Sequence, residues 1–216
     1  MTALSYSRIL GANNRLRMGY IGVGNRGDQV HDGFLEHGDQ ETTAVCDLRE
    51  DYMDFAVKKS RAQPKKYKDY RQLIDDKNVD AVAISTPDHW HAMHTMMACA
   101  AGKDVYVEKP MTLFVREGRW MTQVARRHGR VVQCGTQQRS GLHYQKAREL
   151  VRNGHVGKIM SVRMTAFRNV MPGFGSPPDG TAPADFDYDM WLGPAPKRPF
   201  NPKRGIYHFR WFWDYS

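Results

Sequence analysis

The chain of 216 residues has few cysteines and no long apolar run. Its three cysteines, Cys46, Cys99 and Cys134, are widely spaced and contain no Cys-x-x-Cys pair, which argues against a zinc site and a disulfide framework. No stretch is long and apolar enough to cross a membrane. Residues 1–17 contain neither an apolar signal segment nor a twin arginine. As written, the sequence predicts a cytoplasmic protein, and a periplasmic location would require an export signal missing from this chain.

Acidic residues are also in the minority, with 23 Asp and Glu against 32 Lys and Arg, so the formal charge is +9. A positive excess favours anionic partners such as a phosphorylated cofactor, an acidic substrate or nucleic acid. The densest basic cluster, residues 58–68, is typical of a solvated helix face. No recognition helix, zinc finger or aromatic platform accompanies it, so we do not expect nucleic-acid binding.

Along residues 18–136, the sequence pattern alternates between short apolar strands and helices. We expect strands at residues 18–24, 42–47, 79–86, 104–109 and 130–136, and helices at 28–37, 49–62, 89–102 and 114–129. This alternation predicts an α/β fold, a doubly wound parallel sheet of the Rossmann type.

The pattern changes after Gly141. Residues 142–154 predict a further helix, and residues 158–168 alternate as a strand covered on one face does. We therefore divide the chain into an N-terminal extension (1–17), a dinucleotide-binding Rossmann domain (18–141) and the start of a second, α+β domain with an open sheet (142–216).

A glycine turn follows the first strand, with the pattern Gly22-Val-Gly24-Asn25-Arg26-Gly27. The first glycine allows the tight turn, the second lets the backbone approach a pyrophosphate, and the third lets the helix pack against the strand. An acidic residue, Asp47, ends the second strand about 20 residues later. Its carboxylate would accept hydrogen bonds from ribose hydroxyls and would repel a 2′-phosphate, which favours NAD. A nearby arginine, Arg49, keeps NADP possible.

The third strand ends at Ser85-Thr86-Pro87, where Thr86 and Pro87 are placed to contact a cofactor beyond the carboxyl end of the sheet. Three histidines follow, at positions 89, 91 and 94. No acidic ligand completes a metal site with them, so we expect no metal there. We expect His91 to be buried and hydrogen-bonded, or to pack near the cofactor.

The fourth strand ends in Glu108-Lys109-Pro110. Consecutive side chains of a strand point to opposite faces, so Glu108 and Lys109 are not expected to pair, and Lys109 can reach the cleft alone. Pro110 ends the strand. An amine at this place can hydrogen-bond a substrate hydroxyl or carbonyl oxygen. An ordinary strand exit with solvated charges is the alternative.

The glycine turn, the segment STPDHWH and above all Glu108-Lys109-Pro110 resemble the Gfo/Idh/MocA family of nicotinamide-dependent oxidoreductases, which includes inositol and glucose–fructose oxidoreductase-type enzymes. The resemblance extends over nearly the whole chain. It implies that Lys109 lines the junction of cofactor and substrate, and that an α/β substrate domain follows the Rossmann domain. Members of the family carry an Asp and a His on a later helix, for which this sequence has no match. We therefore expect the chain to be truncated at its C-terminus.

These observations predict an enzyme that transfers a hydride between NAD, with NADP as the alternative, and a secondary alcohol of a sugar or polyol, with Lys109 as the catalytic residue. The residues expected to bind the cofactor are Gly22, Gly24, Asn25, Arg26, Gly27, Asp47, Thr86, Pro87, His91 and Glu108. Those expected to bind the substrate are Lys109, Gln137, Arg139, His143, Tyr144 and Arg168.

Several points stay open from the sequence. Trp211 and Trp213 are interpreted as core residues, with a sugar-facing wall as the alternative. The full-length protein is expected to form a homo-oligomer. The alternative functions are an NAD-dependent glycosidase of the same superfamily and a non-catalytic NAD-binding protein or fragment.

Overall fold

The computed structural model describes residues 15–165, 175–205 and 207–216. The chain divides into two units. The first unit combines the residues up to Gly135 with Pro178–Ser216, and the second spans Thr136–Pro177. We describe each unit by itself.

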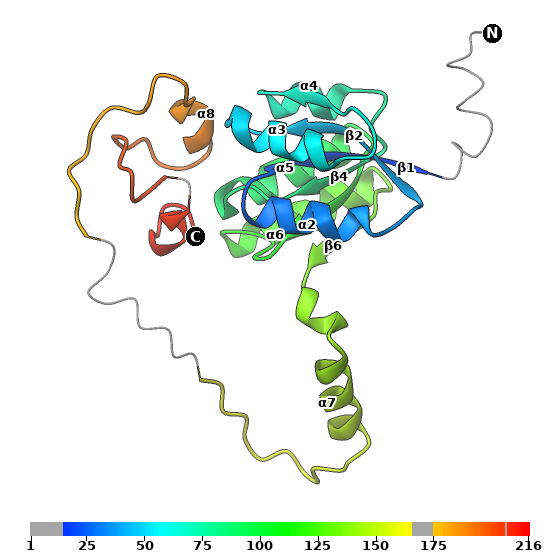
Figure 1. The fold of residues 1–216 in the computed structure, drawn as a ribbon. Helices are drawn as coiled ribbons and strands as arrows, with labels where there is room; N and C mark the ends of the chain where they lie inside the picture. The colour runs from blue at the N-terminus through cyan, green and yellow to red at the C-terminus, as the bar shows by residue number, and fades with distance from the viewer. Residues whose placement is uncertain (1–14, 166–174, 206) are drawn as a thin grey trace, which may run out of the picture. The chain divides into compact units, whose positions relative to one another are not determined.

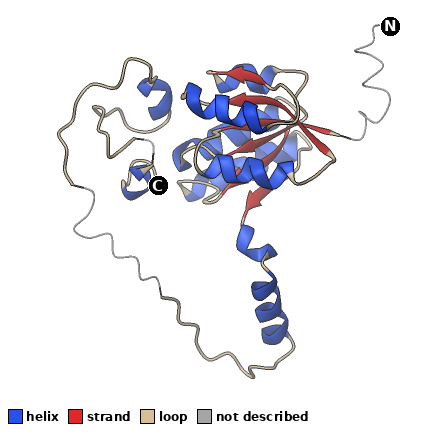
Figure 2. Ribbon diagram, in the orientation of Figure 1, coloured by secondary structure: helices blue, strands red, loops and turns tan. Residues whose placement is uncertain are grey.

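The first unit is built on a six-stranded parallel sheet (Figure 1, Figure 2). Its strands, in the spatial order β3-β2-β1-β4-β5-β6, are β3 (Lys65–Tyr67), β2 (Gln40–Cys46), β1 (Leu16–Ile21), β4 (Ala81–Ile84), β5 (Asp104–Glu108) and β6 (Val132–Gly135). All five neighbouring pairs are parallel. The chain moves outward from β1 to β3 and then returns to β4 on the other side of β1, so the order of strands reverses between β1 and β4. Ligands of open α/β sheets bind at such a reversal, beyond the carboxyl ends of the strands.

Helices cover both faces of this sheet, as predicted for a doubly wound fold (Figure 2). They are α2 (Arg26–Leu35), α3 (Glu50–Lys59), α4 (Tyr70–Asp75), α5 (Asp88–Ala100) and α6 (Val115–Arg127). Alternate strand residues enter two separate apolar clusters. One cluster packs strand residues such as Ile84 against α4, α5 and α6, and the other packs Ala83 and its equivalents against α2 and α3. All four residues of β4 are buried, which is why the sequence shows a continuous apolar run there.

Within residues 16–135 of this unit, two elements were not predicted. The strand β3 has only three residues, two of them exposed lysines, so it lacks an apolar run. The helix α4 has six residues, and Asp69 caps it by accepting a hydrogen bond from the backbone N–H of Arg71 at 2.9 Å. Elements this short carry too few periodic positions to be recognised by pattern.

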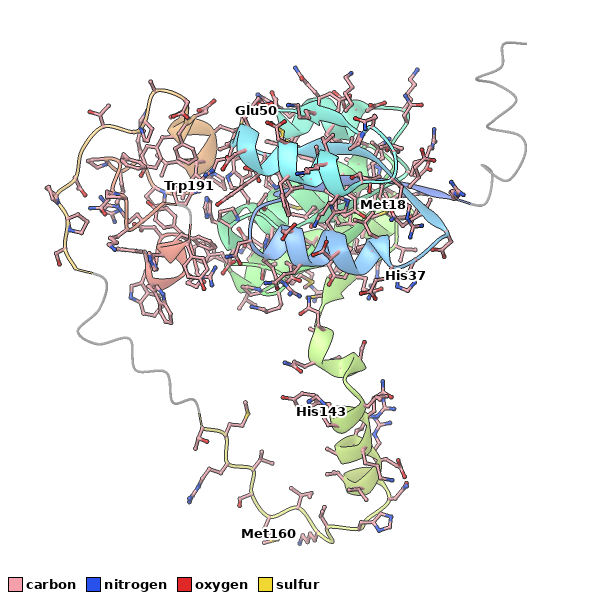
Figure 3. The ribbon with its side chains drawn as sticks, viewed as in Figure 1. Met18, His37, Glu50, His143, Met160 and Trp191 are labelled. Atoms are coloured by element: carbon pink, nitrogen blue, oxygen red, sulfur yellow. The ribbon has the colours of Figure 1, made fainter. Side chains whose placement is uncertain are left out.

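The segment from Pro178 onward packs on the first turn of α5. It contains α8 (Tyr188–Leu192), the short 3₁₀ helix η3 (His208–Trp211) and a small apolar cluster that includes Trp191 (Figure 3). The Trp191 carbonyl oxygen accepts hydrogen bonds from His89 Nε2 and Trp90 Nε1, each at 3.0 Å. Gly193 lies against the Trp90 ring, where a Cβ atom would approach a ring carbon to 2.0 Å. The His-Trp pair of STPDHWH therefore serves as a docking point for this segment.

The second unit contains the 3₁₀ helix η2 (Gln137–Ser140) and α7 (Leu142–Arg152). Gly154 follows α7 with φ of 76°, a conformation that suits glycine at a helix end. The predicted strand at 158–168 is wrong for residues 158–165, which form no strand. A strand requires a neighbour for its hydrogen bonds, and the described residues provide none. The apolar side chains of this stretch are therefore exposed, with 80% of Met160 accessible to solvent (Figure 3).

Candidate active site

A cavity of about 690 Å³ lies in the first unit at the carboxyl ends of the central strands. The volume is within the range of small-molecule sites, roughly 300–1,000 Å³. Its lining includes every residue expected to bind the cofactor except Gly27, and it also includes Lys109. These residues lie at the ends of β1, β2, β4 and β5, in the turns that follow these strands, or in the first turns of α2 and α5. The fold thus brings the separate sequence motifs to one place.

The glycine turn forms one side of the cavity, and its backbone leaves no room for larger residues. Gly22 has φ of 81°, and a Cβ atom there would lie 2.9 Å from the backbone of Ser85 and Thr86. A Cβ atom on Gly27 would lie 1.9 Å from the Gly22 carbonyl oxygen. Gly27 is therefore a packing residue under the turn, as its place in the motif indicates. The helix α2 begins directly after Asn25, so its dipole and the first-turn N–H groups other than that of Gly27, which donates to the Gly24 carbonyl oxygen at 2.7 Å, favour a phosphate at this place.

Asp47 is held rigidly at the end of β2. Its carboxylate accepts hydrogen bonds from the backbone N–H of Val23 at 2.9 Å and of Arg49 at 3.0 Å. Burial raises the pKa of the Asp47 carboxyl from its ordinary value. The Arg49 guanidinium is engaged elsewhere, because it bonds the Asp51 carboxylate through Nε at 3.0 Å and stacks 4.2 Å from the Tyr52 ring centre.

Glu108 is buried, with 2% of its surface accessible, and its charge is matched by an arginine of the glycine turn. Its Oε1 accepts a hydrogen bond from Arg26 Nε at 2.9 Å, and its Oε2 accepts one from the Lys109 backbone N–H at 3.1 Å. The ion pair at the tip of β5 is thus Glu108 with Arg26, which is 82 residues away in the sequence. No local pattern in the sequence could have indicated this pairing.

The side chain of Lys109, which directly follows β5, is exposed and lines the same cavity. Its ammonium group makes no hydrogen bond or ion pair with any residue that the structure describes. The Lys109–Pro110 peptide bond is cis. A cation with free donors at the mouth of a cavity is suited to bind an oxygen that carries developing negative charge.

The three histidines of α5 turn to different partners. His89 contacts the Trp191 carbonyl oxygen, and His94 stacks on Trp90, with ring centres 4.5 Å apart. His94 Nδ1 also lies 3.3 Å from Thr86 Oγ1. His91 places Nδ1 2.6 Å from the Pro110 carbonyl oxygen and Nε2 2.8 Å from that of Thr86. His91 lines the cavity, but both of its ring nitrogens face the protein.

The remaining residues predicted to bind substrate lie in the second unit or outside the description. Gln137 and Arg139 belong to η2, and His143 and Tyr144 belong to the first turn of α7 (Figure 3). Their part in substrate binding stays a prediction. Arg168 lies outside the described residues.

The two tryptophans near the end of the chain differ from each other. Trp213 is 94% exposed, so its interpretation as a core residue is wrong. Trp211 is half-exposed and lines the cavity. Sequence reasoning also missed several cavity residues, namely Tyr52, Tyr70, Met190, Tyr207 and Arg210. These residues come from helices and from the segment after Pro178, and nothing in their local sequence marks them as neighbours of the glycine turn.

The sequence matches two known families of domains. Residues 16–136 match the Gfo/Idh/MocA family described as "Oxidoreductase family, NAD-binding Rossmann fold", and residues 123–216 match its "C-terminal alpha/beta domain". The chain belongs to the Gfo/Idh/MocA oxidoreductase family. The resemblance, the fold class and the NAD-binding Rossmann fold expected from the sequence are thereby confirmed.

The sequence of this Gfo/Idh/MocA family member is similar to those of several curated proteins, three of which are described here. It is 32% identical over 168 residues to D-glucoside 3-dehydrogenase of Escherichia coli, covering 74% of this chain and 46% of the relative. It is 32% identical over 152 residues to myo-inositol 2-dehydrogenase of Thermotoga maritima, covering 70% and 45%. A glycosyl hydrolase family 109 protein of Shewanella putrefaciens is 37% identical over 110 residues, covering 47% and 24%. The chain therefore spans less than half the length of these relatives.

Solved structures agree with the family. Myo-inositol 2-dehydrogenase of Lactobacillus plantarum is 30% identical, with a TM-score of 0.63 over 67% of this chain and 43% of that protein. Scyllo-inositol dehydrogenase of Lactobacillus casei, solved with NAD(H) and scyllo-inositol, is 25% identical, with a TM-score of 0.61 over 66% of this chain and 42% of that protein.

Among the residues that our structure describes, no helix has the length and apolar character needed to cross a bilayer.

Proposed function

We propose that the full-length protein is an NAD-dependent dehydrogenase that oxidises a secondary alcohol of a sugar or polyol, or reduces the corresponding ketone. The observation that supports this most directly is the Lys109 ammonium, which lies in the same cavity as the glycine turn and has no partner within the described part of the chain. When bound, the nicotinamide ring accepts or returns the hydride. The dehydrogenases among the relatives act on glucosides and inositols, as their names state, which supports the same class of substrate.

The residues of this chain would bind and orient the cofactor and the substrate, and they would polarise the reacting oxygen. The N–H groups at the start of α2 meet the phosphates, and Asp47 accepts hydrogen bonds from ribose hydroxyls. Lys109 donates a hydrogen bond to the reacting oxygen and stabilises the alkoxide charge that develops on it. Gln137, Arg139, His143, Tyr144 and Arg168 remain our candidates for contacts with the other hydroxyls.

We also propose that the cofactor is NAD and not NADP. The Asp47 carboxylate would repel a 2′-phosphate. Arg49 already bonds Asp51 through Nε and stacks on Tyr52, so fewer of its donors remain for a 2′-phosphate.

A second candidate is an NAD-dependent glycosidase, which the similarity to a glycosyl hydrolase family 109 protein favours. The two functions differ in their products. We expect the full-length protein to form NADH when mixed with NAD and free inositols or glucosides. If chromogenic glycosides are cleaved without net NADH, the glycosidase is correct and the dehydrogenase is not.

A further inference from the structure

His91 bridges the ends of two neighbouring strands through both of its ring nitrogens. It lies in the first turns of α5 and is almost completely buried, with 1% of its surface accessible. Nε2 faces the carbonyl oxygen of Thr86, just beyond β4, at 2.8 Å. Nδ1 faces the carbonyl oxygen of Pro110, just beyond β5, at 2.6 Å.

A neutral imidazole cannot satisfy both contacts. It carries one N–H donor and one nitrogen with a lone pair, and a carbonyl oxygen can only accept. One of the two contacts would then set a nitrogen lone pair against an oxygen lone pair inside hydrogen-bond distance. Only the doubly protonated ring can donate to both oxygens. Both spacings, 2.8 Å to Thr86 and 2.6 Å to Pro110, lie within hydrogen-bond distance.

The neighbouring histidines lack this constraint. His94 Nδ1 faces the hydroxyl of Thr86, which can donate as well as accept. Burial lowers the pKa of His89 to about 4 and the pKa of His94 well below its ordinary value, and the nearby His91 lowers the pKa of both further. Two neutral rings therefore flank the one ring whose contacts require a charge.

The contact with Pro110 has a consequence for Lys109, which directly precedes it. On one side of Lys109, the backbone N–H donates to Glu108, which Arg26 holds in turn. On the other side, the Pro110 carbonyl is held by His91. The peptide units that flank Lys109 are thus tied to the glycine turn and to the end of β4.

We propose that His91 is a positioning residue, in which a doubly protonated imidazole ties Thr86 to Pro110 and so fixes the backbone of Lys109 in the cavity. The contact of His91 with the cofactor stays a prediction beside this role, because His91 also lines the cavity. The effect of the positioning role on turnover rests on the proposed dehydrogenase function, whereas the protonation state of the ring does not.

The protonation state is tested first, on the unmodified full-length protein. Solid-state NMR of protein labelled with ¹⁵N-histidine distinguishes protonated ring nitrogens from unprotonated ones. The signals of His91 are those that are absent from the spectrum of the His91→Gln variant. We expect both His91 nitrogens to carry protons. A single unprotonated His91 nitrogen overturns the proposal, even if the protein proves not to be a dehydrogenase.

The positioning role is tested by kinetics with His91→Gln, which can donate to only one of the two carbonyls, and His91→Phe, which donates to neither. The matched control is His128→Gln, at an exposed position after α6. We expect turnover to fall by about 10-fold in the first variant and about 100-fold in the second, with NAD affinity preserved and the control unchanged.

A double variant separates positioning from a merely structural role. If His91 acts through Lys109, adding His91→Gln to the Lys109→Met variant should not lower turnover any further. Equal losses in both backgrounds, or parallel losses of NAD affinity and turnover, would overturn the proposal.

Discussion

The Lys109 ammonium is the group on which the proposed chemistry depends, and replacing it by methionine tests that dependence. Lys109→Met keeps an unbranched side chain of similar length and removes the charge and all three donors. The side chain is exposed in the cavity and pairs with none of the described residues, so its loss leaves no partner unsatisfied. We therefore expect the fold and the affinity for NAD to be preserved.

The expected kinetic loss follows from the geometry. Removing one preorganised donor to a developing oxyanion typically costs about 10²–10³ in turnover, or about 3–4 kcal/mol of barrier. Lys109→Arg keeps the charge but not the compact ammonium, so an intermediate rate is expected. The control is Lys77→Met, at an exposed position after α4.

The assay is steady-state NADH formation by the full-length protein, together with NAD binding followed by fluorescence titration. Deuterium at the oxidised carbon adds a second readout, because slowing the chemical step should expose a larger isotope effect in Lys109→Met. Unchanged turnover in that variant, or equal loss in the Lys77 control, would refute the assigned role.

Three further predictions concern the cofactor site and stability. Gly22→Ala should weaken NAD binding and lower the melting temperature, because φ is 81° and the added Cβ meets backbone at 2.9 Å, whereas Gly38→Ala, with nothing within 4 Å, should do neither. Asp47→Ala should narrow the preference for NAD over NADP in binding titrations, and an unchanged ratio would contradict the assigned contact with the ribose. Burial lowers the pKa of His31 and of His89 to about 4 in the folded state, so the unfolded chain protonates first as pH falls. Stability should be retained above about pH 6.5 and lost between about 6.5 and 4, by up to about 3 kcal/mol per histidine, and a denaturant-unfolding profile that is flat over this range would contradict it.

Much of the nucleotide-binding half could be predicted because its signals are local. The strands that became β1, β2, β4 and β5 contain apolar stretches, and each begins a strand–helix unit with a helix of ten or more residues, α2, α3, α5 and α6. The glycine turn depends on a backbone conformation that glycine adopts readily and other residues do not, so the spacing of the glycines predicts the turn. The failures have an equally physical origin. The predicted strand at 158–168 has the right alternation, but a strand also requires a partner, which a pattern within one segment cannot supply.

The sequence by itself determined the alternating fold, the glycine turn and the chemical types of the groups at the strand ends. Only the tertiary structure decided which of these groups meet. It paired Glu108 with Arg26, left the Lys109 ammonium in the cavity without a partner among the described residues, and set His91 between two carbonyl oxygens. The physical reason is that local backbone preference depends on neighbours in the chain, whereas the partner of a buried charge or ring is chosen by the packing of distant strands and helices.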